Sequence, residues 1–263
     1  MSRDCGRLVL AAWLAADALG VAGAAPSDTV LADCAAQALP RSSMTQVQRV
    51  RVEGAGGWVR ESLRRVYFKR TGADETRLLV ILDEPRQEAG LKVLVIKQAD
   101  TRPEVWVYSP DMRRARRMVG AGASSSALGS DFTAADAEHL AGFLVGDDVR
   151  VLGDTTHAGR AAVLLEAPVA ASDTGYVRIR VTLDRAWCVP LRAVFIGADG
   201  APVKSLEAPA TRVSAVAGRH VPMETVVIDA KSGNRTTVTL DAVEIDVPLA
   251  DALFAPQSLE QAQ

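Results

Sequence analysis

The sequence has almost no net charge, few histidines and no long hydrophobic run beyond its first residues. Lys and Arg number 30 against 32 Asp and Glu, so the formal charge of −2 gives no broad attraction to nucleic acid. After residue 24, no segment is apolar over the roughly 20 residues that a bilayer span needs, which predicts a soluble mature protein. The 263 residues, 48% of them hydrophobic, are enough for one domain with a sizeable core.

The usual catalytic motifs are also missing. The sequence has no Gly-x-Ser-x-Gly elbow, no Walker-type phosphate loop and no Gly-x-Gly-x-x-Gly after a strand. The three histidines, His139, His157 and His220, stand far apart and form no His-x-x-x-His pair. A triad assembled from distant segments stays open, because triads are defined by geometry. We expect a protein that is not an enzyme, with no catalytic residue, no metal and no cofactor.

The first residues have the pattern of an export signal. Arg3 and Arg7 precede a mostly apolar run over Leu8–Gly20, and small residues end it at Ala22-Gly23-Ala24. The alternative, a retained membrane anchor, would be shorter than the roughly 20 residues that span a bilayer. We therefore predict a cleaved signal peptide over residues 1–24 and export to the periplasm.

Two cysteines remain in the predicted mature domain, which covers residues 25–263. Cys5 lies within the leader, and Cys34 and Cys188 are an even number in a chain sent to an oxidising compartment. One disulfide between them is a candidate. Two unpaired, buried small residues are the equal alternative, because separation in sequence does not determine separation in space.

The mature chain reads mostly as strand. Helical patterns occur only after Ser27 and after Ser130, whereas Tyr176–Leu183 alternates apolar and polar residues with a period of two. Similar short runs occur at 66–69, 78–82, 91–96, 105–108, 161–165, 191–196, 203–206, 221–228 and 236–245. About ten strands with two helices, never alternating, predict a mainly β fold: a curved antiparallel sheet that forms an incomplete barrel lidded by helices.

The densest cluster of charge follows an aromatic strand. Trp106 and Tyr108 precede a Pro turn, and four arginines then occupy five positions: Arg113, Arg114, Arg116 and Arg117. Such a cluster is a candidate contact for lipid phosphates or an acidic partner surface. The alternative is the solvated side of an amphipathic hairpin.

These residues carry a resemblance to a known family. The segment Trp106-x-Tyr108-x-Pro110 with its four arginines, then Leu128-Gly129-Ser130-Asp131-Phe132-Thr133 and Asp136, resembles the signature of periplasmic outer-membrane lipoprotein-sorting proteins. Later motifs follow in the same order and spacing: Tyr176-x-Arg178-x-x-Val181, Asp199-Gly200 with Lys204, Val221-Pro222-Met223, Thr236-x-Val238-x-Leu240 and Phe254-x-x-x-x-Leu259. Cys34 and Cys188 depart from that pattern.

The resemblance implies a fold similar to the carrier LolA and the receptor LolB, in which helices lid a hydrophobic cavity. It implies a monomeric carrier of lipid or lipoprotein acyl chains that touches membranes transiently and works with an inner-membrane pump of the resistance-nodulation-division type. Apolar strand positions are candidates for the cavity lining, with a closed, ligand-free core as the alternative. They are Val66, Phe68, Leu79, Ile81, Leu94, Ile96, Val105, Val107, Val177, Ile179, Val194 and Ile196.

Two other functional classes stay open. A similar half-barrel occurs in periplasmic regulators that sense lipoproteins, but those carry a further domain, and this chain ends soon after Phe254. A hydrolase acting on lipid or peptidoglycan would need a nucleophile and a base, and we identify no such pair. The fold by itself does not establish the cargo.

Overall fold

The computed structural model describes residues 34, 40–72, 75–98, 101, 103–118, 136, 148–169 and 175–261. The predicted signal peptide lies outside these residues, and so do the two predicted helices, apart from Cys34 and Asp136. The predicted helical lid is therefore not tested by the structure. Within the described ranges, no helix is both long enough and apolar enough to cross a membrane.

Strands make up most of the described chain. The first seven are β1 (Ser43–Glu53), β2 (Val59–Thr71), β3 (Glu75–Glu84), β4 (Lys92–Gln98), β5 (Glu104–Ser109), β6 (Arg114–Met118) and β7 (Arg150–His157). The others are β8 (Arg160–Pro168), β9 (Arg178–Asp184), β10 (Pro190–Ile196), β11 (Pro202–Glu207), β12 (Val213–Val216), β13 (Arg219–Pro222), β14 (Glu224–Asp229) and β15 (Arg235–Ile245). Short 3₁₀ helices form at η2 (Ala210–Arg212), η3 (Asp251–Phe254) and η4 (Pro256–Glu260).

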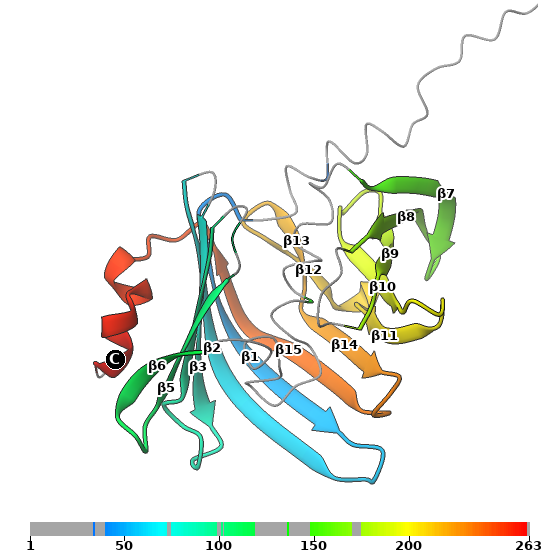
Figure 1. Cartoon of the computed structure of the whole chain (residues 1–263). Coiled ribbons are helices and arrows are strands. Elements are labelled where there is room, and N and C mark those ends of the chain that lie inside the picture. The colour runs from blue at the N-terminus through cyan, green and yellow to red at the C-terminus, as the bar shows by residue number, and fades with distance from the viewer. Residues whose placement is uncertain are drawn as a thin grey trace, which may run out of the picture.

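Thirteen of these strands form one sheet in the order β6-β5-β4-β3-β2-β1-β15-β14-β11-β10-β9-β8-β7. Each neighbouring pair is antiparallel. The sheet curves into an arc, and its edge strands β6 and β7 do not pair with each other (Figure 1). The predicted curved antiparallel sheet is confirmed, and it stays open instead of closing into a barrel.

Two of the hairpins turn through an Ala-Gly pair. Ala158-Gly159 joins β7 to β8, and Ala217-Gly218 joins β12 to β13 in a separate two-stranded sheet. All four residues have positive φ, between 48° and 77°. A two-residue turn with positive φ at both positions has the twist of the strands that it joins, which explains the tight hairpins.

The two faces of the sheet bury different clusters. Side chains alternate along a strand, so each strand gives one row of residues to each face. The C-terminal segment with η3 and η4 packs on the outer, convex face next to β3–β6 (Figure 1). Phe254 and Leu259 are both 0% exposed there, against Leu79, Ile81 and Leu94. Burying each of these two side chains contributes roughly 1.5–3 kcal/mol, which holds the segment on the sheet.

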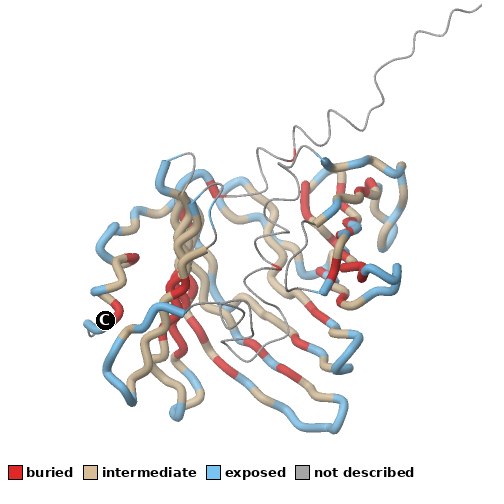
Figure 2. Tube along the Cα trace, viewed as in Figure 1, coloured by how far each residue is buried: buried red, intermediate tan, exposed pale blue. Residues whose placement is uncertain are grey.

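The larger cluster lies on the inner, concave face of the other half of the sheet. Buried residues gather in the part formed by β8–β11 as well as near the middle of β3 and β4 (Figure 2). A disulfide joins Cys34 to Cys188, with the two Cα atoms 5.0 Å apart, so the bonded alternative is the one in the structure. Its neighbours in this cluster are Val163, Leu165, Tyr176, Ile179, Val181, Leu183, Ala193, Phe195, Leu206 and Val227.

Candidate functional site

The candidate site is the inner face of the arc. Strand register identifies the residues that share this face: Val66 of β2 pairs with Val80 of β3, which pairs with Val93 of β4, which pairs with Val107 of β5. On β1 and β15, Val50 pairs with Val238. Apolar side chains therefore continue across neighbouring strands. Several are only half-buried, namely Phe68, Leu78, Val95, Val107, Val238 and Leu240.

The predicted cavity-lining residues divide between the two faces. Val66, Phe68, Val105, Val107 and Ile179 lie on the inner face. Lipid contact by these residues stays a prediction, because the structure contains no ligand. The predicted set of lining residues left out further apolar residues of the same face, among them Val50, Val80, Val93, Val181 and Phe195.

Other predicted lining residues face outward. Leu79, Ile81, Leu94 and Ile96 pack together with the C-terminal segment. Val194 and Ile196 pair with the exposed residues Arg180 and Arg178. Val177 precedes β9, so strand register assigns it to neither face; its backbone N–H donates to the carbonyl of Ile196. The apolar pattern did not separate the faces, because β3 and β4 carry apolar side chains on both faces, as Leu79 and Val80 show.

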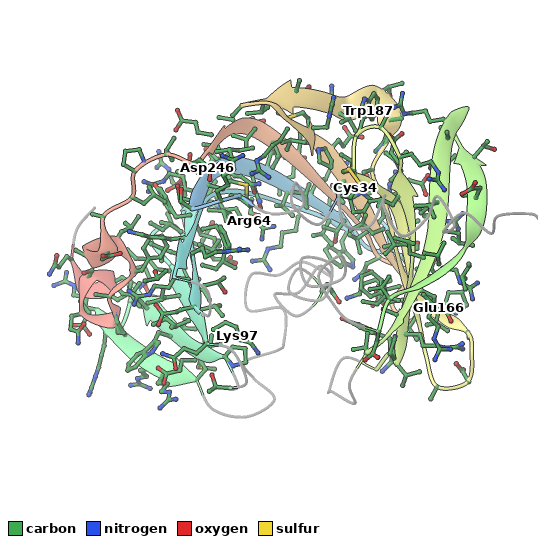
Figure 3. The ribbon with its side chains drawn as sticks, turned by 90° about the horizontal axis from the view of Figure 1, so that it is seen from above. Cys34, Arg64, Lys97, Glu166, Trp187 and Asp246 are labelled. Carbon is green, nitrogen blue, oxygen red and sulfur yellow. A yellow bond between two sulfur atoms is a disulfide. The ribbon has the colours of Figure 1, made fainter. Side chains whose placement is uncertain are left out.

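The inner face also holds one buried cation. Arg64 of β2 is 6% exposed and lies on the concave side of the arc (Figure 3). Its Nε donates to Oε1 of Gln48 at 2.9 Å, and Nε2 of Gln48 donates to Oε1 of Gln46. Burial lowers the pKa of the Arg64 guanidinium to about 10, so it stays positively charged at neutral pH. Arg64 is not among the predicted site residues, because the predicted apolar run of this strand begins at Val66.

Three motif residues meet in a buried polar network. Nζ of Lys204 lies 2.6 Å from Oδ2 of Asp136, and the hydroxyl of Tyr176 donates to Oδ1 of Asp136 at 2.9 Å. Tyr176 lies 40 residues after Asp136 in the chain, and Lys204 lies 68 residues after it. Each belongs to a motif of the family resemblance, but the motifs did not predict that they contact one another. Such a satisfied network fixes one arrangement of the segments that contribute to it.

The predicted contact residues separate into a packed pair and an exposed group. Trp106 and Tyr108 are partly buried in the outer cluster, and the Lys92 ammonium lies 5.3 Å from the centre of the Tyr108 ring. Arg113 lies in the β5–β6 turn with φ 48°, and Arg114, Arg116 and Arg117 follow on the edge strand β6. All four arginines are exposed. Arg117 is ion-paired with Glu104, with Nη2 2.9 Å from Oε1, and the four exposed side chains together form the candidate contact for an anionic surface.

The two described histidines each have an identified neighbour. His157 Nε2 lies 3.1 Å from Oε1 of Glu207, and the His220 ring stacks on Trp187 with ring centres 5.4 Å apart. His139 lies outside the described residues. Among the residues that the structure describes, no group of three or more His, Cys, Asp and Glu side chains is placed to hold a metal ion. Among the described residues, Arg64 and Lys204 are the buried cations of the inner face, where Gln46, Gln48 and Ser62 lie among the apolar side chains.

Three solved structures of similar fold show what the chain resembles. A putative outer membrane lipoprotein-sorting protein domain from Vibrio parahaemolyticus is 19% identical with a TM-score of 0.77, covering 89% of this chain and 97% of that one. A DUF1329 family protein from Desulfovibrio piger is 22% identical with a TM-score of 0.77, covering 89% and 99%. A LolA superfamily protein from Nitrosomonas europaea is 18% identical with a TM-score of 0.63, covering 87% and 96%.

Comparison of the sequence with family models shows which family the chain belongs to. No curated protein sequence matches the chain. A family model with the description "Uncharacterized protein" matches residues 74–261, which is more than half of the chain. The predicted resemblance to outer-membrane lipoprotein-sorting proteins is confirmed by the fold. The chain therefore belongs to the family of this model and has the fold of outer membrane lipoprotein-sorting and LolA superfamily proteins.

Proposed function

We propose that this protein is a periplasmic carrier that binds lipid, or the acyl chains of lipoproteins, on the inner face of its open sheet. The observation that carries the proposal is the apolar inner face, which continues from strand to strand while several of its side chains stay half-buried. Each methylene group removed from water contributes about 0.8 kcal/mol, so an apolar wall binds acyl chains without any reactive group.

Transfer of such a cargo needs contact with a membrane or a transporter. The exposed arginines of the β5–β6 hairpin, with Met112 exposed beside them, provide a cationic surface for anionic lipid or for an acidic surface of an inner-membrane pump. On a β edge, arginines also prevent pairing with other sheets. In this proposal the protein is a carrier, not an enzyme, and its pump is of the resistance-nodulation-division type.

Native mass spectrometry of the full chain, expressed with export and purified from a bacterial periplasm, tests the carrier proposal. We expect additional masses that correspond to lipid and disappear after extraction with organic solvent. Delipidated protein should then take up added phospholipid at defined stoichiometry. Protein that is folded, carries no lipid and takes none up would contradict the proposal and favour a closed core.

A further inference from the structure

Two consecutive arginines of β2 lie on opposite faces of the sheet in contrasting environments. Arg65 on the outer face forms a two-pronged ion pair with Asp83: Nε lies 2.9 Å from Oδ2, and Nη2 lies 2.9 Å from Oδ1. Arg64 on the inner face has no carboxylate partner among the residues that the structure describes. Its hydrogen bond goes to the neutral side chain of Gln48.

The donors of Arg64 are only partly used. The Nε–H of Arg64 donates to Oε1 of Gln48. Nε2 of Gln48 donates to Gln46, and Nε2 of Gln46 donates to Sδ of Met44, so the Gln48 amide keeps its oxygen toward Arg64. Nη1 and Nη2 carry four further N–H groups, and within the described part of the chain none of them has an acceptor. Such a guanidinium can donate two parallel hydrogen bonds to a phosphate or a carboxylate.

The surroundings of Arg64 make an unpaired charge expensive. On its own strand it lies between Ser62 and Val66 of the same face, and its cross-strand neighbour Leu82 is 1% exposed. A charge without a counter-ion is unfavourable beside apolar side chains, and a counter-charge with good geometry offsets that cost. An apolar wall with one oriented cation is the usual composition of a ligand site, in which the polar group fixes the orientation of the ligand.

We infer that Arg64, oriented by Gln48 and Gln46, binds the anionic oxygens of the lipid that the inner face carries, as a phosphate or carboxylate of its head group. This inference rests on the proposed carrier function and narrows its cargo to lipids whose head group carries a phosphate or a carboxylate. The acyl chains lie on the apolar wall, and the guanidinium fork meets the head group. The charge of Arg64 is compensated when the cargo is bound.

Calorimetric titration of the delipidated full chain with two lipids of identical chains tests the inference. The probes are dioctanoyl phosphatidylglycerol, which is anionic, and dioctanoylglycerol, which is neutral. A charge-assisted hydrogen-bond pair predicts that the wild type prefers the anionic lipid by roughly tenfold or more. Arg64→Gln should reduce this preference to within about threefold while binding of the neutral lipid is retained.

Two variants control for fold and for charge. Arg65→Gln removes the same charge from the adjacent residue on the outer face and should leave the preference unchanged. Arg64→Lys retains the charge without the fork and should give an intermediate preference. Arg64→Gln is expected to fold, because it removes a buried charge that has no ionic partner, and circular dichroism checks this.

The outcomes separate the inference from the carrier proposal. If the wild type binds both lipids equally, or Arg64→Gln keeps the full preference, the head-group role is overturned and the carrier proposal stands. If neither lipid binds, both fail. Inorganic phosphate is titrated alone and as a competitor: binding of phosphate as tight as that of the phospholipid would assign Arg64 to a soluble anion and overturn the lipid assignment.

Discussion

Lys204 and Asp136 form an ion pair in the interior of the protein, with Nζ 2.6 Å from Oδ2 and both side chains at most 10% exposed. The pair joins β11 to Asp136, which lies in the chain between β6 and β7. The Tyr176 hydroxyl donates to the other carboxylate oxygen, so both oxygens of Asp136 are engaged.

Breaking this pair from one side should lower stability strongly. Lys204→Met removes the Lys204 ammonium from the buried Asp136 carboxylate, and we expect a loss of about 3–5 kcal/mol in the free energy of unfolding. Urea denaturation measures it. The control is Arg49→Gln, which breaks the exposed pair with Asp241 and should cost less than about 1 kcal/mol. An equal loss of unfolding free energy in the two variants would show that the buried pair contributes no more to stability than the exposed pair.

Lipid uptake should depend on the face that carries a substitution. Val107 and Val194 are both half-buried strand valines, but Val107 lies on the inner face and Val194 on the outer face. Val107→Asp places a carboxylate on the apolar wall and should reduce uptake of phospholipid at least about tenfold, because burying a charge beside acyl chains is costly. Val194→Asp, next to Arg180, should keep uptake near the wild-type level. Uptake is measured by native mass spectrometry, and the reverse order would place the lipid on the outer face.

Binding to anionic membranes should depend on the β5–β6 hairpin. Replacing Arg113, Arg114, Arg116 and Arg117 together by Ser should weaken sedimentation with phosphatidylglycerol vesicles at least about tenfold at low salt, since each arginine near such a surface contributes about 1 kcal/mol. The matched control replaces four exposed arginines elsewhere, Arg49, Arg178, Arg180 and Arg192, and changes the net charge by the same amount. If both quadruple variants bind equally weakly, net charge and not this hairpin drives the contact.

Acid should destabilise the protein partly through Asp184. Burial by itself raises the pKa of this carboxyl, but hydrogen bonds from Arg160 and from the backbone N–H groups of Trp187 and Ala186 outweigh burial, so its pKa lies below the ordinary 3.8. A carboxyl with a depressed pKa stabilises the fold above its ordinary pKa, and this contribution is lost as the pH falls from there through the folded-state pKa.

The variant Asp184→Asn isolates that contribution. The wild type should be more stable than the variant at neutral pH, and the difference should shrink as the pH falls below about 4. Urea midpoints measured from pH 7 downward give the two curves. Curves that stay parallel throughout would mean that protonation of Asp184 does not take part in acid destabilisation.

The alternation of apolar and polar residues did not predict several of the strands. β1 contains Gln46, Gln48, Arg49 and Arg51, so its alternation is weak although Val50 and Val52 are buried. β6 consists largely of arginines, and β7 and β12 were missed as well. The predicted strand over 221–228 is two strands, because Met223 separates β13 from β14. In β1, pairing on both sides outweighs weak propensity, because such a strand tolerates polar residues. β6 and β7 are edge strands, and β12 pairs only with β13, so each of these three is paired on one side.

The sequence by itself determined that the chain is a succession of antiparallel strands, because alternating side chains and short Gly turns are local properties. It also contained the motifs that identified the fold. Only the tertiary structure decided which row of each strand faces inward, that Cys34 meets Cys188, and that Asp136 meets Lys204. Face and partner depend on the register of strands far apart in the chain, and a shift of one residue exchanges the two faces, so no local pattern determines them.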